Sequence, residues 1–271
     1  RRFLKKKNHI LMGILNMTPD SFSDGGKFNS TKKAIQRISL MKKTGAEIID
    51  IGGESTRPGS KIISQKKELQ RVKKVLIQFK KKFPKTLLSV DTRKSLVMDF
   101  SIKKNADIIN DVSCFKFDPK SFGIINNKNL WKIIHHMQGT PQNMQINPSY
   151  NNVILDIYDF FENQIKKFKS DKYKDKIILD PGIGFGKNLK HNLMILKKIS
   201  IFHSLGFPVL IGTSRKRFIG QISGSYDTKE RVGGTLSSIL FSLSQGIRIF
   251  RVHNVEEVKQ GILVYEALIN K

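Results

Sequence analysis

Short apolar segments recur eight times along the chain, and most of them end in polar or glycine-rich residues. They begin near residues 10, 47, 87, 107, 131, 177, 208 and 247. One of them, Ile177-Ile178-Leu179, is too short for a helix and rich in β-branched residues, as buried strands are. It stops at Asp180, before Pro181 and three alternating glycines. Alone, this stretch is equally compatible with an ordinary strand-to-helix turn, so it is the repetition that constrains the fold.

Amphipathic helical patterns separate most of these segments. In the clearest one, Val72, Leu76 and Phe79 recur at spacings of three and four and so share one face of a helix. Eight strand-then-helix units in about 250 residues are typical of a (β/α)₈ barrel, the TIM barrel fold. We therefore predict a single α/β domain over residues 1–271, with parallel strands joined by right-handed crossovers.

Parallel strands in a barrel have their carboxyl ends on one face, which is where such proteins bind their ligands. Each polar residue at a strand end has an ordinary explanation when taken singly, such as an N-cap for Asp91 or a surface salt bridge for Arg57. Their coincidence at one face instead predicts a binding site. The residues at or just past the strand ends are Asn16, Thr56, Arg57, Asp91, Asn110, Asp180, Lys216, Arg251 and His253.

The acidic members of this set indicate what the site binds. Asp91, Asn110 and Asp180 offer hydrogen-bond acceptors. A carboxylate can accept two N–H bonds side by side, so two acids suit a flat heterocycle with an amidine or guanidine edge. Lys216 adds a donor for a ring carbonyl.

The remaining members suit an anion and a metal ion. Arg57, Arg251 and His253 form a cationic set suited to phosphate or pyrophosphate. Asn16 has a neutral oxygen for Mg²⁺, which takes few protein ligands beside phosphate oxygens and water. These residues predict a nitrogen heterocycle that bears a pyrophosphate leaving group, and they leave the acceptor substrate open.

The formal net charge of +27 first suggests a nucleic-acid or membrane-surface protein. The lysines, however, fall in pairs and triplets on the polar faces of helices in every part of the chain, whereas a binding patch would be concentrated. Lys, Ile and Asn share AT-rich codons, so we favour genomic base composition over nucleic-acid binding. We therefore expect no nucleic-acid or membrane partner, and a field that attracts anionic substrates.

The compartment is indicated by two features. One cysteine, Cys114, excludes an internal disulfide and fits a reducing environment. The basic start of the chain is followed by only a short apolar run, and we expect no signal peptide. The protein is thus expected to be cytoplasmic.

At the level of whole motifs, the sequence resembles the bacterial dihydropteroate synthases over essentially its full length. This family condenses 6-hydroxymethyl-7,8-dihydropterin pyrophosphate with 4-aminobenzoate, giving 7,8-dihydropteroate and pyrophosphate in folate synthesis, and sulfonamides compete with the aminobenzoate. The matching motifs are ILNMTPDSFSDGG (14–26), IIDIGGESTRPG (48–59), SVDTRK (89–94), IINDVS (108–113), HMQGTPQNMQ (136–145), LDPGIGFGKNLKHN (179–192), GTSRK (212–216) and RVHNV (251–255).

The resemblance implies a role for each matched residue. Asp91, Asn110, Asp180 and Lys216 would hold the pterin, Asn16 would bind Mg²⁺, and Arg57, Arg251 and His253 would bind the pyrophosphate. Met137 and Gly212 would belong to the substrate-binding set as well. Thr56, Pro58, Phe185 and Ser214 would frame the aminobenzoate, with Lys216 between the two substrates.

The resemblance also implies a dissociative mechanism, with Asp91, Lys216 and Arg57 as the catalytic residues. Pyrophosphate leaves first, and the acidic pocket stabilises the pterin-methyl cation before the aminobenzoate nitrogen attacks. The loops at 17–26 and 54–60 would close over the site when substrate is bound.

A homodimer is expected, because the family is usually dimeric and the C-terminal segments 236–243 and 262–268 are unusually apolar for exterior helices. Two alternatives remain at this point. A methyltetrahydrofolate:corrinoid methyltransferase shares the pterin acids but has no use for the loop of Thr56 and Arg57. A basic nucleic-acid-binding barrel would instead be retained on DNA or RNA in a salt-dependent way.

Overall fold

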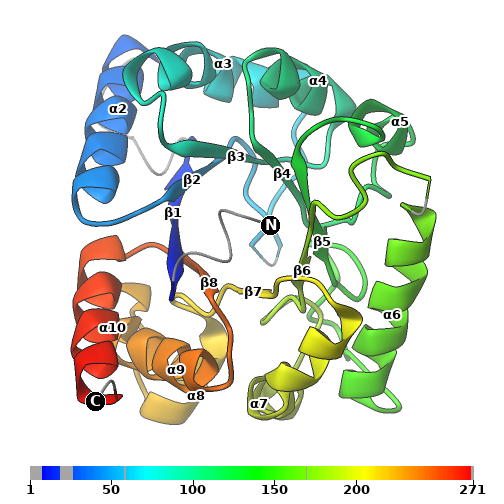
Figure 1. Cartoon of the computed structure of the whole chain (residues 1–271), viewed down its shortest axis with the longest axis vertical. Coiled ribbons are helices and arrows are strands. Elements are labelled where there is room, and N and C mark those ends of the chain that lie inside the picture. The colour runs from blue at the N-terminus through cyan, green and yellow to red at the C-terminus, as the bar shows by residue number, and fades with distance from the viewer. Residues whose placement is uncertain (1–7, 19–26, 58, 169, 270–271) are drawn as a thin grey trace.

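The computed structural model describes residues 8–18, 27–57, 59–168 and 170–269, so Pro58 and most of the loop at 17–26 lie outside the described residues. Eight parallel strands form one sheet in the order β6-β5-β4-β3-β2-β1-β8-β7. A parallel bridge between Leu179 and Val209 joins β6 to the segment leading into β7 and so closes the sheet into a barrel, as the sequence predicts (Figure 1). The strands are β1 (Ile10–Asn16), β2 (Ile48–Gly52), β3 (Leu87–Asp91), β4 (Ile108–Asp111), β5 (Trp131–His135), β6 (Ile177–Asp180), β7 (Leu210–Ile211) and β8 (Ile249–Val252).

Helices form an outer ring around the barrel (Figure 1). Their apolar faces pack on the outer side of the strands, for example through Val72 and Phe79 of α3 and Phe161 of α6, all fully buried. They are α2 (Lys27–Lys43), α3 (Gln65–Lys82), α4 (Ser95–Lys103), α5 (Ser121–Ile125), α6 (Val153–Lys167), α7 (Leu189–Lys197), α8 (Arg217–Ser223), α9 (Val232–Ser244) and α10 (Val255–Ile269), with 3₁₀ turns η2 (Ile199–Leu205) and η3 (Thr228–Arg231).

The barrel interior is layered, because side chains along a strand alternate between its two faces. One apolar layer closes the end of the barrel where the strands begin: Ile10, Met12, Ile48, Ile108, Ile133, Ile178, Leu210 and Ile249. Two residues further along the strands, alternation directs polar side chains to the same interior. These residues are Asp50, Asn110, His135, Asp180 and Arg251. The site is therefore built on an apolar floor.

Lysines end α2, α3 and α6, at the face opposite the carboxyl ends of the strands. A positive charge there complements the negative end of each helix dipole. A buried ion pair lies on the outer side of β5, where Lys132 Nζ is 2.6 Å from Asp171 Oδ2 and both side chains are inaccessible. Among the described helices, none combines the length and the apolarity that crossing a bilayer requires.

The loop after β6 lies directly against the loop after β5. Gly182 has a φ of +69°, and a Cβ atom there would overlap the carbonyl oxygen of His136. Gly186, with a φ of +61°, would in the same way overlap the carbonyl oxygen of Gln138. Only glycine combines this conformation with this close approach.

We predict that Gly182→Ala destabilises the protein much more than Gly206→Ala. Gly206 has a φ of +77°, but a Cβ atom there would meet nothing within 4 Å beyond its own chain neighbours. The left-handed conformation alone costs an L-residue roughly 1–2 kcal/mol, which both variants share. Gly182→Ala adds the overlap with His136. Urea denaturation of the two variants measures the difference, and equal midpoints would show that the two loops are not packed as described.

Candidate active site

A cavity of about 710 Å³ opens at the carboxyl ends of the strands. Ten of the residues expected from the sequence line it, on β1, β3, β8 and the loops after β2, β6, β7 and β8: Asn16, Thr56, Arg57, Asp91, Phe185, Gly212, Ser214, Lys216, Arg251 and His253. Asn110 and Asp180 are buried in the polar layer on the neighbouring strands β4 and β6. Met137 is not among the residues that line the cavity, and Pro58 lies outside the described residues.

A guanidinium group joins two carboxylates at the centre of this layer. Arg251 donates from Nε to Asp50 Oδ2 at 2.7 Å and from Nη2 to Asp91 Oδ2 at 2.8 Å. Burial raises the pKa of Asp91 to about 8, against the charge of Arg251 and with the help of the neighbouring Asp50. Two acids thus share one cation, and either of them gains from a second positive charge brought by a ligand.

Asp50 is the residue that sequence reasoning missed. It is fully buried and, besides Arg251, accepts a hydrogen bond from the Ser89 hydroxyl at 2.6 Å and one from Asn110 Nδ2 at 3.2 Å. The strand-end rule selects residues at or past the ends of strands, whereas Asp50 lies within β2. A carboxylate inside an otherwise apolar strand, at even spacing from Ile48 and Gly52, is the signal that would have found it.

Asn110 is oriented by this contact. Because its amide nitrogen donates to Asp50, its Oδ1 atom is left as an acceptor. Oδ1 is buried and has no hydrogen-bond partner within the described residues. A buried acceptor of this kind costs free energy unless a ligand donates to it.

Asp180 provides a second acceptor. Its Oδ1 atom accepts the amide hydrogen of Gly182 at 2.8 Å, and its Oδ2 atom lies 3.9 Å from His135 Nε2, beyond hydrogen-bond distance. Burial raises the pKa of Asp180 to about 6, against the Gly182 hydrogen bond and the positive charge of Lys216. Burial and nearby lysines also lower the pKa of His135, so this imidazole is neutral.

Lys216 and Phe185 meet across the cavity wall, with Nζ 4.0 Å from the ring centroid. Burial lowers the pKa of Lys216 to about 8; Arg251 lowers it further, and Asp180 and Asp91 oppose this. The buried Lys187 fixes the other side of Phe185, because its Nζ donates to the Phe185 carbonyl and to His136 Nδ1, both at 2.9 Å. The backbone of Phe185 is therefore fixed beside the cavity.

Contrary to what the sequence led us to expect, the three basic residues Arg57, Arg251 and His253 are not all free cations. His253 Nδ1 lies 3.0 Å from the Ser214 hydroxyl, and burial together with Arg251 and Arg215 lowers the pKa of His253 to about 3. His253 is thus neutral, and the charge of Arg251 is balanced by two acids. Arg57 is exposed at the cavity mouth, and no carboxylate of the described residues forms a salt bridge with it.

No cluster of three His, Cys, Asp or Glu side chains suited to a metal ion occurs in the described ranges. Asn16 does line the cavity, and its Oδ1 atom lies near Gly52, which pairs with Asp91 in the sheet. One neutral oxygen fits an ion such as Mg²⁺ that is held mainly by phosphate oxygens and water.

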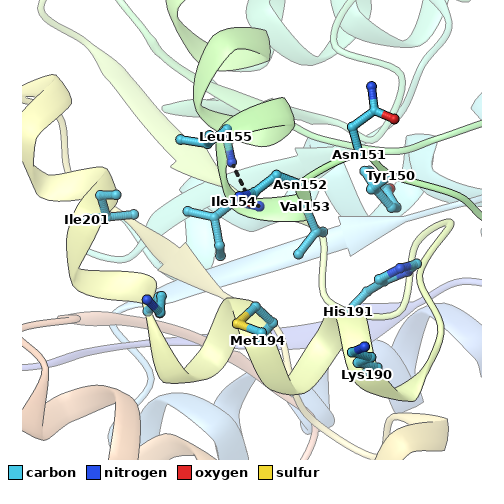
Figure 2. Close-up of a pocket in the computed structure, with 11 residues that line it drawn as sticks. Tyr150, Asn151, Asn152, Val153, Ile154, Leu155, Lys190, His191, Met194 and Ile201 are labelled. Atoms are coloured by element: carbon cyan, nitrogen blue, oxygen red, sulfur yellow. Dashed lines mark hydrogen bonds between the residues drawn. The ribbon is translucent and has the colours of Figure 1, made fainter.

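A second cavity, of about 540 Å³, lies outside the barrel between the start of α6 and α7 (Figure 2). Its lining includes Leu155, Met194 and Ile201 beside Lys190 and His191, and no lining residue is acidic. It lacks the carboxylates that distinguish the barrel mouth.

The raised pKa of Asp180 predicts a pH dependence of heterocycle binding. The ionised carboxylate accepts two N–H bonds, so affinity for the unphosphorylated hydroxymethylpterin that the sequence resemblance implies should fall as the pH drops through about 6. Asp180→Asn should weaken binding by about 1.5–3 kcal/mol and remove the step near pH 6. Fluorescence titration of the pterin measures both, and a step that persists in the variant would assign the titration to another group.

The chain is similar to known proteins over almost its whole length. Residues 12–253 match the family model described as pterin binding enzyme. The dihydropteroate synthase of Escherichia coli (strain K12) is 42% identical over 261 residues, covering 96% of this chain and 92% of that protein.

Two solved structures are similar over the whole barrel. The dihydropteroate synthase of Yersinia pestis in a sulfonamide drug complex has a TM-score of 0.89 at 40% identity, covering 96% of this chain and 93% of that chain. The enzyme of Xanthomonas albilineans with 4-aminobenzoic acid has a TM-score of 0.88 at 33% identity, with coverages of 96% and 93%.

Proposed function

The chain belongs to the dihydropteroate synthase family of pterin-binding enzymes, and from this premise we propose which of its residues hold each substrate. As an enzyme of this family it transfers a pterin-methyl group from a pyrophosphate ester to 4-aminobenzoate in folate synthesis. The relatives compared are dihydropteroate synthases, so the corrinoid methyltransferase alternative is set aside.

The pterin is assigned to the polar layer. The observation that supports this most is Asn110 Oδ1, a buried acceptor with no hydrogen-bond partner within the described residues. Asp180 adds a second acceptor, because its Oδ2 atom lies 3.9 Å from His135 Nε2, beyond hydrogen-bond distance. A pterin presents ring N–H and amino donors along one edge, which would satisfy both. Lys216 would donate to the ring carbonyl, and Asp91 would lie beside the methylene carbon.

The pyrophosphate is assigned to the basic side of the cavity. Arg57 would supply a full charge and His253 a neutral hydrogen bond. Arg251 uses two of its five N–H donors on carboxylates, so the others are available to phosphate oxygens. Asn16 would ligate Mg²⁺, which when bound would neutralise charge on the departing pyrophosphate.

Bond breaking follows from these positions. The bond between the methylene carbon and the bridging oxygen breaks, and its electron pair leaves with the pyrophosphate. Asp91, whose charge is costly in the buried site, would be stabilised by the cation that forms beside it. The amine of 4-aminobenzoate then attacks the methylene carbon and loses a proton.

The aminobenzoate is assigned to the outer part of the cavity, between Thr56, Phe185 and Ser214, with Pro58 on the same loop as Thr56. Phe185 would provide a flat apolar surface and Ser214 a hydroxyl group. Lys216 would separate the two substrates, consistent with its contact to the Phe185 ring.

The homodimer is part of the same proposal. On α9 and α10, Phe241, Leu263, Val264 and Leu268 are each about half exposed or more. Apolar side chains at this density on exterior helices fit a surface covered by a second copy of the chain. Light scattering at micromolar concentration should give the mass of a dimer, and a monomer would contradict the proposal.

Arg57→Ala tests the link between pyrophosphate and acceptor. Arg57 lies next to Thr56, so an anion bound by Arg57 should order the aminobenzoate site. In the native protein, pterin with pyrophosphate should tighten sulfonamide binding by roughly 5- to 150-fold, a typical coupling. Arg57→Ala should abolish this gain and leave free pterin binding nearly unchanged.

Calorimetry of sulfonamide binding, with and without pterin and pyrophosphate, measures this coupling. Lys61→Ala is the matched control, because Lys61 is an exposed cation on the same loop that does not line the cavity. Equal sulfonamide affinity in both conditions would mean that the acceptor site is preformed.

A further inference from the structure

Four charged side chains are buried behind the loop that follows β2. Glu54 accepts from Arg93 Nε at 2.9 Å and from Lys94 Nζ at 2.8 Å, and Lys94 Nζ also lies 2.8 Å from Glu68 Oε2 on α3. Each of these four side chains is at most 4% exposed. We call Glu54, Glu68, Arg93 and Lys94 the loop anchor.

Glu54 ties together the two ends of this loop. It directly precedes Ser55, Thr56 and Arg57, and its Oε1 atom also accepts the amide hydrogen of Ile63 at 3.0 Å. One carboxylate thus closes residues 54–63 into a ring that contains the proposed acceptor-binding residue and the exposed arginine. Because Glu54 itself is immobilised by two cations, the position of the ring depends on them.

Those two cations follow the pterin-binding strand directly. Asp91 ends β3, and the next three residues are Thr92, Arg93 and Lys94. The amide of Thr92 donates to the Asn110 carbonyl at 2.9 Å, which fixes this segment to β4. Arg93 is further held over the Phe117 ring, 4.1 Å from its centroid. Arg93 and Lys94, two and three residues after Asp91, therefore contact the Glu54 carboxylate that closes the loop at 54–63.

Glu54 is the ionised centre of the anchor. Burial opposes ionisation of Glu54, but the hydrogen bonds from Arg93 and Lys94 outweigh it and lower its pKa. Burial raises the pKa of Glu68, against the positive charge of Lys94. Such a buried arrangement is costly to form and gives little net stability, which is consistent with a role in geometry.

We infer that Glu54, held by Arg93 and Lys94, is a positioning residue that places the Thr56–Arg57 loop for 4-aminobenzoate and pyrophosphate relative to the strand of Asp91. This inference rests on the proposed function, which assigns the acceptor to that loop. Glu54 does not touch the reacting atoms of the substrates, which would lie beside Asp91 and Lys216. It acts through the loop, by fixing the position of the acceptor site relative to them.

Glu54→Gln tests the inference, because it keeps the shape of the side chain and removes the charge. Misplacing an acceptor site by about 1 Å can cost up to about 100-fold, and we expect the KM for 4-aminobenzoate to rise by about tenfold or more. Binding of free pterin, measured by fluorescence, should change less than about twofold, since Asp91, Asn110 and Asp180 are untouched.

Asp171→Asn is the matched control. It removes the acidic partner of the buried Lys132 pair, which lies on the outer side of β5. It should lower the unfolding midpoint as Glu54→Gln does, while leaving the KM for 4-aminobenzoate within about twofold of the native value. A similar KM increase in both variants would reduce the anchor to a general stabilising element and overturn the inference.

If Glu54→Gln does not fold, Arg93→Lys provides the milder test. It keeps the positive charge but loses the Nε hydrogen bond to Glu54, so the KM for 4-aminobenzoate should rise in the same selective way. A native KM in folded Glu54→Gln or Arg93→Lys would overturn the inference. Failure of the proposed function would give a different result. If the Thr56–Arg57 loop did not bind the acceptor at all, Arg57→Ala would bind the acceptor as tightly as the native protein does.

Discussion

The guanidinium of Arg251, held between Asp50 and Asp91, is the interaction on which the site depends. Without it, two carboxylates on neighbouring strands would repel each other in a region that water barely reaches. With it, Asp50 keeps a fixed position and orients the amide of Asn110. The arrangement therefore sets the direction of an acceptor that Arg251 itself does not touch.

Much of the fold and of the candidate site could be predicted from the sequence, because a barrel brings the carboxyl ends of all its strands to one face. Short apolar strands that end in Asp91, Asp180 or Arg251 specify the face where these residues meet, whatever lies between them. The fold and the cluster of strand-end residues on one cavity follow from that rule, and the comparisons confirm the family.

Other features could not be predicted, because they depend on contacts between distant segments. Asp50 lies inside a strand, and its partners Ser89 and Arg251 are far away in the sequence. The neutral state of His253 results from burial and from neighbouring arginines that only the fold brings close. Glu54 likewise gave no sign in the sequence that it would meet Arg93 and Lys94.

The apolar floor of Ile48, Ile133 and their neighbours affects the order in which substrates can enter the cavity. Because the barrel is closed at this end, its cavity is open to solvent only at the opposite end. If the pterin occupies the polar layer on the floor and the aminobenzoate lies above it, the pterin has to enter before the aminobenzoate for both to be bound. The shape of the cavity then imposes an order of binding. An aminobenzoate molecule that bound first would block access of the pterin to its site.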